Sequence, residues 1–248
     1  MTVMPQGRTR RAVLVSSVCA LAVTVLAGCG EGDPDAGTNG VGKLAPATIQ
    51  SRTRTAAEAA STVRLSGTVV TSGRSYTLDM RLKADGGTGS VTSEGATFRL
   101  LRTGDALYLK ANADFWNHAD DGKDSGGSGA ADSLDGKYVK VPKDDPTYKK
   151  FSGFTDKDVL LESLLTLHGT LAADGHHEQS GTRTIRITGD GGTGGTLDVS
   201  LEGKPYPLRL ERGGGAGALR FSDWGKSFTV RVPAAGDTVD YGAQLPTS

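Results

Sequence analysis

Apolar and polar residues alternate along most of the chain after residue 62, which is the pattern of strands that bury one face. The clearest alternation runs from Tyr76 to Lys83, where every second residue is large and apolar. Glycine-rich turns separate the alternating stretches, as Ser72-Gly73 does before this one. The pattern predicts strands at residues 63–69, 76–82, 89–93, 97–102, 106–110, 137–141, 185–187, 197–201, 206–210, 219–221 and 228–232.

Two stretches have helical spacing instead. Residues 46–62 open with Pro46 and continue into an alanine-rich run. Residues 156–168 carry a broad leucine stripe, with Thr155 or Asp156 as the N-cap. Because no strand–helix–strand rhythm is present, we predict an α+β, mostly β domain of about ten or more antiparallel strands. One face of such a sheet is apolar, and we expect the helix pair to cover it.

The first 28 residues differ from the rest of the chain. Arg8, Arg10 and Arg11 precede a run from Ala12 to Ala27 that contains no charge. This run is shorter than the roughly 20 apolar residues of a membrane-spanning helix, whereas its basic start and small final residues are typical of a secretory signal peptide. The adjacent arginines leave twin-arginine export and the general secretory route both open.

The apolar run ends in Leu26-Ala27-Gly28-Cys29, which resembles the lipobox of bacterial lipoproteins. In that family the peptidase cuts directly before the cysteine, and the cysteine thiol carries a diacylglyceryl group. The resemblance implies that residues 1–28 are removed and that lipidated Cys29 anchors an exported protein to the outer face of the cytoplasmic membrane. The alternative is an ordinary secretory signal with a chance cysteine.

Two segments lack apolar periodicity. Residues 29–43 are rich in Gly, Asp and Pro, so we expect the lipidated cysteine and a flexible tether there, ahead of a domain over residues 44–248. Residues 111–120 are expected to include a short helix, and the low-complexity residues 119–135 a mobile surface loop.

Charge gives no support for nucleic-acid binding. The whole chain has 28 basic and 28 acidic residues, and removal of residues 1–28 takes away three arginines and no acid, which leaves a net charge of −3. Binding to a phosphate backbone requires a basic surface, which this composition does not indicate. Cys19 lies in the leader and Cys29 is expected to be acylated, so no disulfide is expected.

The sequence contains no P-loop, G-x-S-x-G or H-E-x-x-H motif. His176-His177-Glu178 is the single cluster of metal-ligating residue types, and it lies in a polar stretch without the four suitably spaced ligands of a zinc site. We therefore interpret it as an exposed loop and expect no metal, no cofactor and no enzymatic activity.

The order of the expected elements and four motifs resemble one family. After the lipobox, the tether and the first helix come GDALYLK at 104–110, GKYVKVP at 136–142, GKPYPLRLE at 203–211 and LRFSDWGKSFTVRVP at 219–233. Over residues 44–240 the chain resembles the LolA/LolB-like lipoprotein-carrier superfamily, and within it the LppX/LprA/LprF/LprG group. The resemblance implies a strongly curved antiparallel half-barrel, with helices packed in its concave face around a cavity for acylated lipid.

Ten apolar residues are the candidate lining of that cavity, and each of them could equally be ordinary core: Leu78, Met80, Leu82, Phe98, Leu100, Leu107, Leu109, Leu160, Leu164 and Leu201. We therefore weigh two functions. The first is a membrane-anchored lipoprotein that binds and transfers acylated lipids. The second is a non-enzymatic envelope interaction or sensor-partner protein with the same fold and a filled core. In both, we expect a monomer that contacts membrane lipids through its anchor.

Overall fold

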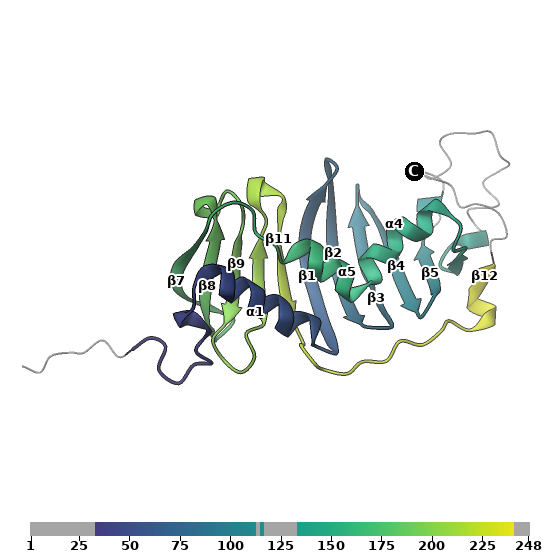
Figure 1. Ribbon diagram of the computed structural model, residues 1–248. Coiled ribbons are helices and arrows are strands. Elements are labelled where there is room, and N and C mark those ends of the chain that lie inside the picture. Colours follow the sequence, from purple (N-terminus) through teal and green to yellow (C-terminus); the bar gives the residue numbers. More distant parts are fainter. Residues whose placement is uncertain (1–32, 113–114, 117–132, 241–248) are drawn as a thin grey trace, which may run out of the picture. The chain divides into compact units, whose positions relative to one another are not determined.

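A single sheet of twelve strands and three helices on one side of it make up the described part of the chain (Figure 1). The computed structural model describes residues 33–112, 115–116 and 133–240. The expected signal peptide, the lipobox, and most of the segments interpreted as a short helix and a mobile loop lie outside these residues. The described residues from Pro34 onward belong to one compact unit.

The strands follow one another in space in the order β12-β6-β5-β4-β3-β2-β1-β11-β10-β9-β8-β7. Their bounds are β1 (Thr62–Thr71), β2 (Arg74–Lys83), β3 (Gly86–Ser93), β4 (Ala96–Thr103), β5 (Ala106–Ala111), β6 (Tyr138–Val141), β7 (Leu171–Gln179), β8 (Thr182–Gly189), β9 (Thr196–Ser200), β10 (Pro207–Glu211), β11 (Gly217–Ser222) and β12 (Thr238–Asp240). The helices are α1 (Pro46–Glu58), α4 (Pro146–Thr155) and α5 (Lys157–Leu164). Neighbouring strands are antiparallel except β12, which pairs parallel with β6. The predicted fold class, a curved and mostly antiparallel sheet with helices on its concave face, is confirmed.

Tight hairpin turns explain why successive strands lie side by side. The β1–β2 turn, Ser72-Gly73, has positive φ at both residues, 49° and 74°. The β3–β4 and β7–β8 turns repeat this with Glu94-Gly95 and Ser180-Gly181. Turns with two left-handed residues match the natural twist of paired strands, so these short sequences set the local pairing.

Three expected elements have different ends or are absent. The first helix ends at Glu58 rather than residue 62, because Thr62 already pairs with Lys83 in the sheet. The helix predicted over residues 156–168 is α5, which ends at Leu164. The strand predicted at residues 228–232 does not join the sheet, although its apolar and polar residues alternate. Both edges of β11 are occupied, by β1 and β10, so the chain leaves β11 and runs to β12 without strand pairing (Figure 1).

Three elements of the described part of the chain were not predicted: α4, β7 and the short strand β12. Helix α4 begins with Asp145 as its N-cap, whose side chain accepts a hydrogen bond from the Thr147 amide, and Pro146 follows at the first helical position. Strand β7 contains the histidine cluster that we interpreted as a loop. It is an edge strand with a bulge between Ala173 and His176 and mostly polar residues, features that discourage pairing with another chain.

Residues 34–43, expected within the flexible tether, pack against the sheet instead. The Asn39 amide donates to the Leu201 carbonyl at 2.8 Å, and the Asn39 side chain donates to the Ser200 carbonyl at 3.0 Å. Arg183 donates to the Ala36 carbonyl, and Val41 is 2% exposed within the core. The folded domain therefore begins near Pro34 rather than at residue 44. The described residues include no helix that is long and apolar enough to cross a bilayer.

Strands β1 and β11 approach closely where β1 contains Gly67. Its φ is 136°, and a Cβ atom at this position would lie 2.2 Å from the Ala218 carbonyl oxygen. A residue with a side chain could fit only if the two strands moved apart, so the glycine is required by the pairing that lies near the centre of the sheet.

We expect Gly67→Ala to lower the free energy of unfolding by about 1–3 kcal/mol, because it adds both a strained φ and a backbone clash. Urea denaturation measures the change. The matched control is Gly153→Ala in α4, where a Cβ atom meets nothing within 4 Å. This control should leave stability unchanged or raise it by up to about 1 kcal/mol. Equal midpoints for Gly67→Ala and the wild type would contradict the account.

Candidate functional site

The sheet brings the candidate lining residues together on its inner face. Three come from β2, two from β4, two from β5 and two from α5, and Leu201 directly follows β9. Nine of the ten are buried members of one hydrophobic cluster, and Leu160 is partly buried against it. Leu100 lies directly opposite Leu109, which shows how the strand register aligns these side chains. These residues therefore belong to one apolar layer between the sheet and the helices.

These side chains fill the interior between sheet and helices. Met80, Leu82, Leu100, Leu107 and Leu201 each have 0% relative exposure. A side chain that bordered a water-sized void would have surface accessible to water, whether or not that void opened to the outside. Each of these five side chains is therefore packed on all sides by protein, and an acyl chain could reach them only by displacing neighbouring groups.

The three helices cover the apolar face unequally. Helix α1 contacts β7 and β8, and α4 contacts β2, β3 and β4, whereas α5 contacts chiefly the two other helices. Figure 1 shows α5 between α1 and α4, across the middle of the sheet. The backbone of α5 therefore stands away from the strands, and its side chains, including Leu161 and Leu164, fill the space beneath it. The contact between α5 and the sheet is therefore made by side chains, without close approach of the two backbones.

Aromatic residues that sequence reasoning missed cover the β2–β5 half of the sheet. Phe151 of α4 packs against Phe98 with ring centroids 4.9 Å apart, and Phe154 packs against Tyr76 at 5.8 Å. The signal that could have located them is the Asp145-Pro146 helix start followed by aromatic residues at helical spacing. Trp116 is 4% exposed beside this aromatic cluster, and its indole nitrogen has no hydrogen-bond partner among the residues that the structure describes.

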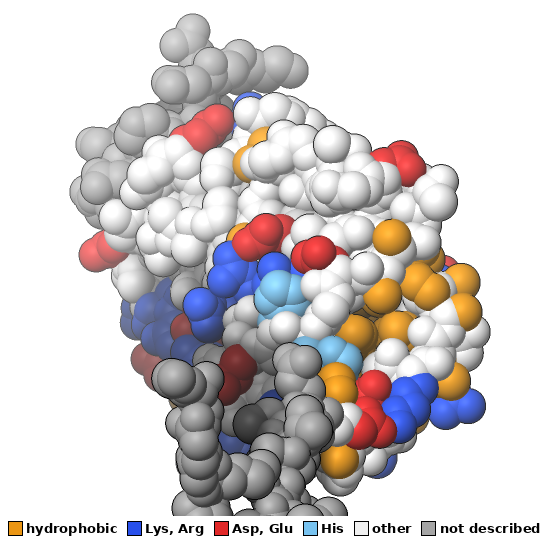
Figure 2. Space-filling model, turned by 90° about the vertical axis from the view of Figure 1, so that its left-hand side faces the viewer, with side chains coloured by type: hydrophobic (Ala, Val, Ile, Leu, Met, Phe, Trp, Pro, Cys, Tyr) orange, Lys and Arg blue, Asp and Glu red, His pale blue; other side chains and the backbone are white. Residues whose placement is uncertain are grey.

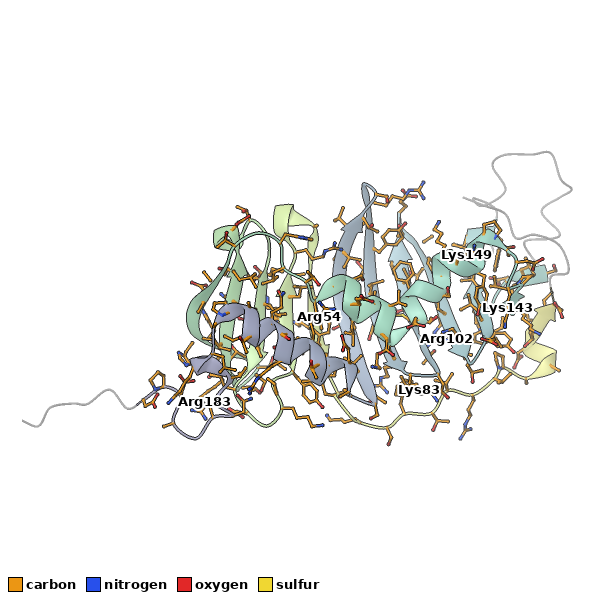
Figure 3. The ribbon with its side chains drawn as sticks, in the orientation of Figure 1. Arg54, Lys83, Arg102, Lys143, Lys149 and Arg183 are labelled. Atoms are coloured by element: carbon orange, nitrogen blue, oxygen red, sulfur yellow. The ribbon has the colours of Figure 1, made fainter. Side chains whose placement is uncertain are left out.

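Two cations tie the helices in place at their ends. Arg102 of β4, labelled in Figure 3, donates from its guanidinium to the Thr155 hydroxyl at 3.2 Å and carbonyl at 3.0 Å, and pairs with Asp156 at 3.4 Å. Lys157 is 2% exposed, and its ammonium donates to the Glu58 carbonyl at 2.9 Å. The α4–α5 junction is thus fixed to the sheet, and the start of α5 is fixed to the end of α1.

A pocket of about 290 Å³ opens at the carboxyl end of α5. Its apolar base is Leu164, Leu167 and Leu210, all members of the same hydrophobic cluster as the candidate lining residues. Polar residues after α5, in the β8–β9 turn and at the end of β10 also line it, among them His168, Thr193, Glu211 and Arg212. The volume lies near the lower limit of about 300 Å³ for small-molecule sites. The pocket is therefore a place where the apolar interior meets the surface.

The pocket was not predicted, because turns far apart in the sequence build it. The segment after α5 lies against the β8–β9 turn, where the His168 amide donates to the Gly194 carbonyl at 3.1 Å. A Cβ atom on Gly194 would lie 2.0 Å from the His168 carbonyl oxygen, so only glycine permits this approach. Helical spacing extended the predicted helix through these residues and concealed the loop.

The resolved pKa shifts arise from ion pairs. A hydrogen bond from Arg64 lowers the pKa of Asp79, one from Lys143 lowers the pKa of Asp105, and Asp198 raises the pKa of Arg186.

Among the described residues, no group of three or more His, Cys, Asp or Glu side chains could hold a metal ion. His176 lies 3.2 Å from the carboxylate of Asp35.

Comparison with known proteins supports the fold. No family model matches the chain, and no curated protein matches its sequence. The solved structure of LprF from Mycobacterium bovis has a TM-score of 0.53 at 15% identity, and the match covers 76% of this chain and 96% of that one. The lipoprotein LppX of Mycobacterium tuberculosis gives a TM-score of 0.46 at 16% identity, covering 75% and 100%. An uncharacterized conserved protein of Thermus thermophilus gives 0.38 at 11%, covering 78% and 98%.

At these sequence identities, structural similarity is evidence for the fold alone. The evidence here is the similarity to LprF. The described part of the chain therefore has an LprF-like fold. The resemblance that the motifs indicated is therefore confirmed at the level of the fold.

We expect Lys157→Ala to lower the free energy of unfolding by about 1–3 kcal/mol, because the Glu58 carbonyl loses its donor at a half-buried position. Urea denaturation measures this change. Lys149→Ala is the matched control, since Lys149 is exposed on α4, and it should change stability by less than about 0.5 kcal/mol. If both variants unfold like the wild type, Lys157 does not tie the two helices.

Proposed function

We propose that this protein is an extracytoplasmic lipoprotein, anchored through Cys29, that binds acylated lipid between its sheet and its helices and transfers it. The lipobox resemblance supports the anchor. The carrier fold and the continuous apolar interior support the binding site. An acyl chain requires apolar surface rather than a set of placed polar groups, and burial of each methylene contributes about 0.8 kcal/mol.

The observation that carries this proposal is the pocket at the end of α5. Its base belongs to the apolar interior, and α5 is the helix that stands away from the strands. An acyl chain that enters over Leu164, Leu167 and Leu210 replaces contacts between α5 and the sheet with contacts of its own. The apolar surface between α5 and the sheet remains covered throughout, so entry of the acyl chain exposes none of it to water.

One observation favours the second function. The five fully buried side chains leave no free space beside them, as expected for a filled core. In that case the same fold acts in the envelope as an interaction or sensor-partner protein without a lipid ligand. Neither function requires catalysis, a metal or a cofactor.

Native mass spectrometry separates the two functions. The chain from residue 29, with Cys29→Ser so that it carries no anchor, is incubated with membrane lipids, and anything bound is extracted into organic solvent. We expect a reproducible excess mass that extracts as acyl lipid. A mass equal to that of the polypeptide alone would contradict the carrier function and leave the filled-core function.

A substitution in the pocket tests the entry route. Ala216 belongs to the pocket lining, and Ala216→Trp places a large side chain there. We expect slower uptake of a fluorescent fatty-acyl probe than in the wild type. The matched control is Ala84→Trp in the exposed β2–β3 turn, which should take up the probe at the wild-type rate. Equal rates for the two variants would show that lipid enters elsewhere.

Cys29→Ala tests the anchor. Without the thiol no diacylglyceryl group is attached, and we expect the lipid mass to disappear from the N-terminal peptide. Cys19→Ala is the matched control, since Cys19 lies within the expected leader, and this variant should keep the lipidated N-terminus. Lipid mass that persists in Cys29→Ala would contradict the proposed attachment site.

A further inference from the structure

The outer face of the sheet carries a row of charged side chains that the proposed lipid site does not use. Strand register places nine residues opposite one another across nine adjacent strands. We refer to them as the outer row: Lys110, Arg99, Ser90, Asp79, Ser66, Arg220, Arg209, Asp198 and Arg186. At the usual spacing between strands the row extends over about 38 Å.

Like charges lie directly opposite each other within this row. Arg99 faces Lys110 on β5, and Arg209 faces Arg220 on β11. Beside the row, Arg64 faces Arg81. Cross-strand pairs of like charge destabilise a sheet, so three such pairs on one face are unfavourable for folding alone.

The carboxylates on these strands do not neutralise the excess. Asp79 is bonded to Arg64 at 2.8 Å, and Asp198 is bonded to Arg186 at 2.7 Å. Glu211 bonds Arg209.

Three cations of the outer row form no ion pair with a carboxylate within the described part of the chain: Arg99, Lys110 and Arg220. In Figure 2 a group of Lys and Arg side chains lies on the left of the view, away from the apolar side chains on the right. The row is therefore a local concentration of positive charge in a chain whose expected mature charge is negative.

We propose that the outer row binds the surface of a bilayer that contains anionic phospholipid. Lipid phosphates supply the negative charges that Arg99, Lys110 and Arg220 lack, and they relieve the repulsion between opposed cations. The choice of a bilayer over another polyanion rests on the proposed anchor. Pro34 is five residues after Cys29, and the chain can span at most about 18 Å over that separation, so the domain stays close to the membrane.

The ordered N-terminal segment supports the same arrangement. Asn39 bonds the end of β9, and Ala36 bonds Arg183 of β8, so the anchored end of the chain meets the domain beside the strands that hold Arg186 and Asp198. One end of the outer row is thus adjacent to the point of attachment. Contact through the row leaves the helices and the pocket on the opposite face of the sheet unobstructed.

Vesicle partitioning tests the proposal. The chain from residue 29 with Cys29→Ser is sedimented with vesicles of phosphatidylcholine, with and without phosphatidylglycerol. We expect binding only where phosphatidylglycerol is present, and weaker binding as salt rises. The triple variant Arg99→Gln, Lys110→Gln, Arg220→Gln should partition about a hundredfold more weakly, at roughly fivefold for each cation lost.

The matched control removes the same charge from the helical face through Arg52→Gln, Lys149→Gln and Lys150→Gln, and it should partition like the wild type. Urea denaturation provides a second measurement, since the outer-row variant loses like-charge pairs and should unfold at the same or a higher urea concentration. Equal partitioning of the two triple variants, or equal binding to neutral vesicles, would overturn the proposal. Binding to a soluble polyanion without binding to vesicles would also overturn it.

Native mass spectrometry of the same outer-row variant keeps the two proposals separate. We expect this variant to retain bound acyl lipid while its vesicle binding falls. Absence of acyl lipid from the chain without outer-row substitutions, with its vesicle binding intact, would count against the internal site alone.

Discussion

The apolar face of the sheet must be covered, and the rest of the structure depends on how this is done. The covering helices have 13, 10 and 8 residues, and helices shorter than about 12–15 residues are marginal in water by themselves. They persist because they bury a face that water disfavours. In the proposed function, an acyl chain covers part of the same face and competes with these helices for it. The proposed lipid binding depends on this competition.

Polar and apolar contacts stabilise the helices on the sheet in different ways. Arg102 and Lys157 bind backbone carbonyls at helix ends, and Gln50 accepts a hydrogen bond from the Leu167 amide. Such directional bonds keep each helix at its position along the sheet. The contacts between α5 and the strands are apolar and non-directional, so they can be exchanged for lipid contacts without leaving a polar group unpaired. A helix tied at its ends and held by side chains in its middle is suited to admitting a ligand.

The sequence predicted most of the fold because alternation is a local signal. Strand β2 has a regular alternation and lies where it was expected, and its inner residues share one face. The same signal at residues 228–232 was misleading, since whether a stretch joins a sheet depends on a free neighbouring edge. Strand β7 is mostly polar and lacks the alternation of apolar and polar residues, although the edge of β8 is free to pair with it. The end of α5 was missed because Leu165 and Leu167 continue the apolar spacing while their backbone has already left the helix.

The candidate site could be predicted only in part for a related reason. Residue spacing predicts which side chains lie on the same face of the sheet. Whether those side chains line a pocket depends on how elements far apart in the sequence pack together. The pocket combines Leu164, Leu210 and the turn at Gly194, and the outer row needs the register of nine strands. Neither arrangement has a local sequence signature.

The most direct test of the central claim is to map where a photoactivatable fatty-acyl probe attaches to the protein after it has bound. The account predicts adducts on residues beneath α5 and along the pocket base, including Leu164, Leu210 and the inner residues of β2. Adducts confined to exposed residues of the outer face, or spread over the surface without preference, would contradict an acyl site between the sheet and the helices.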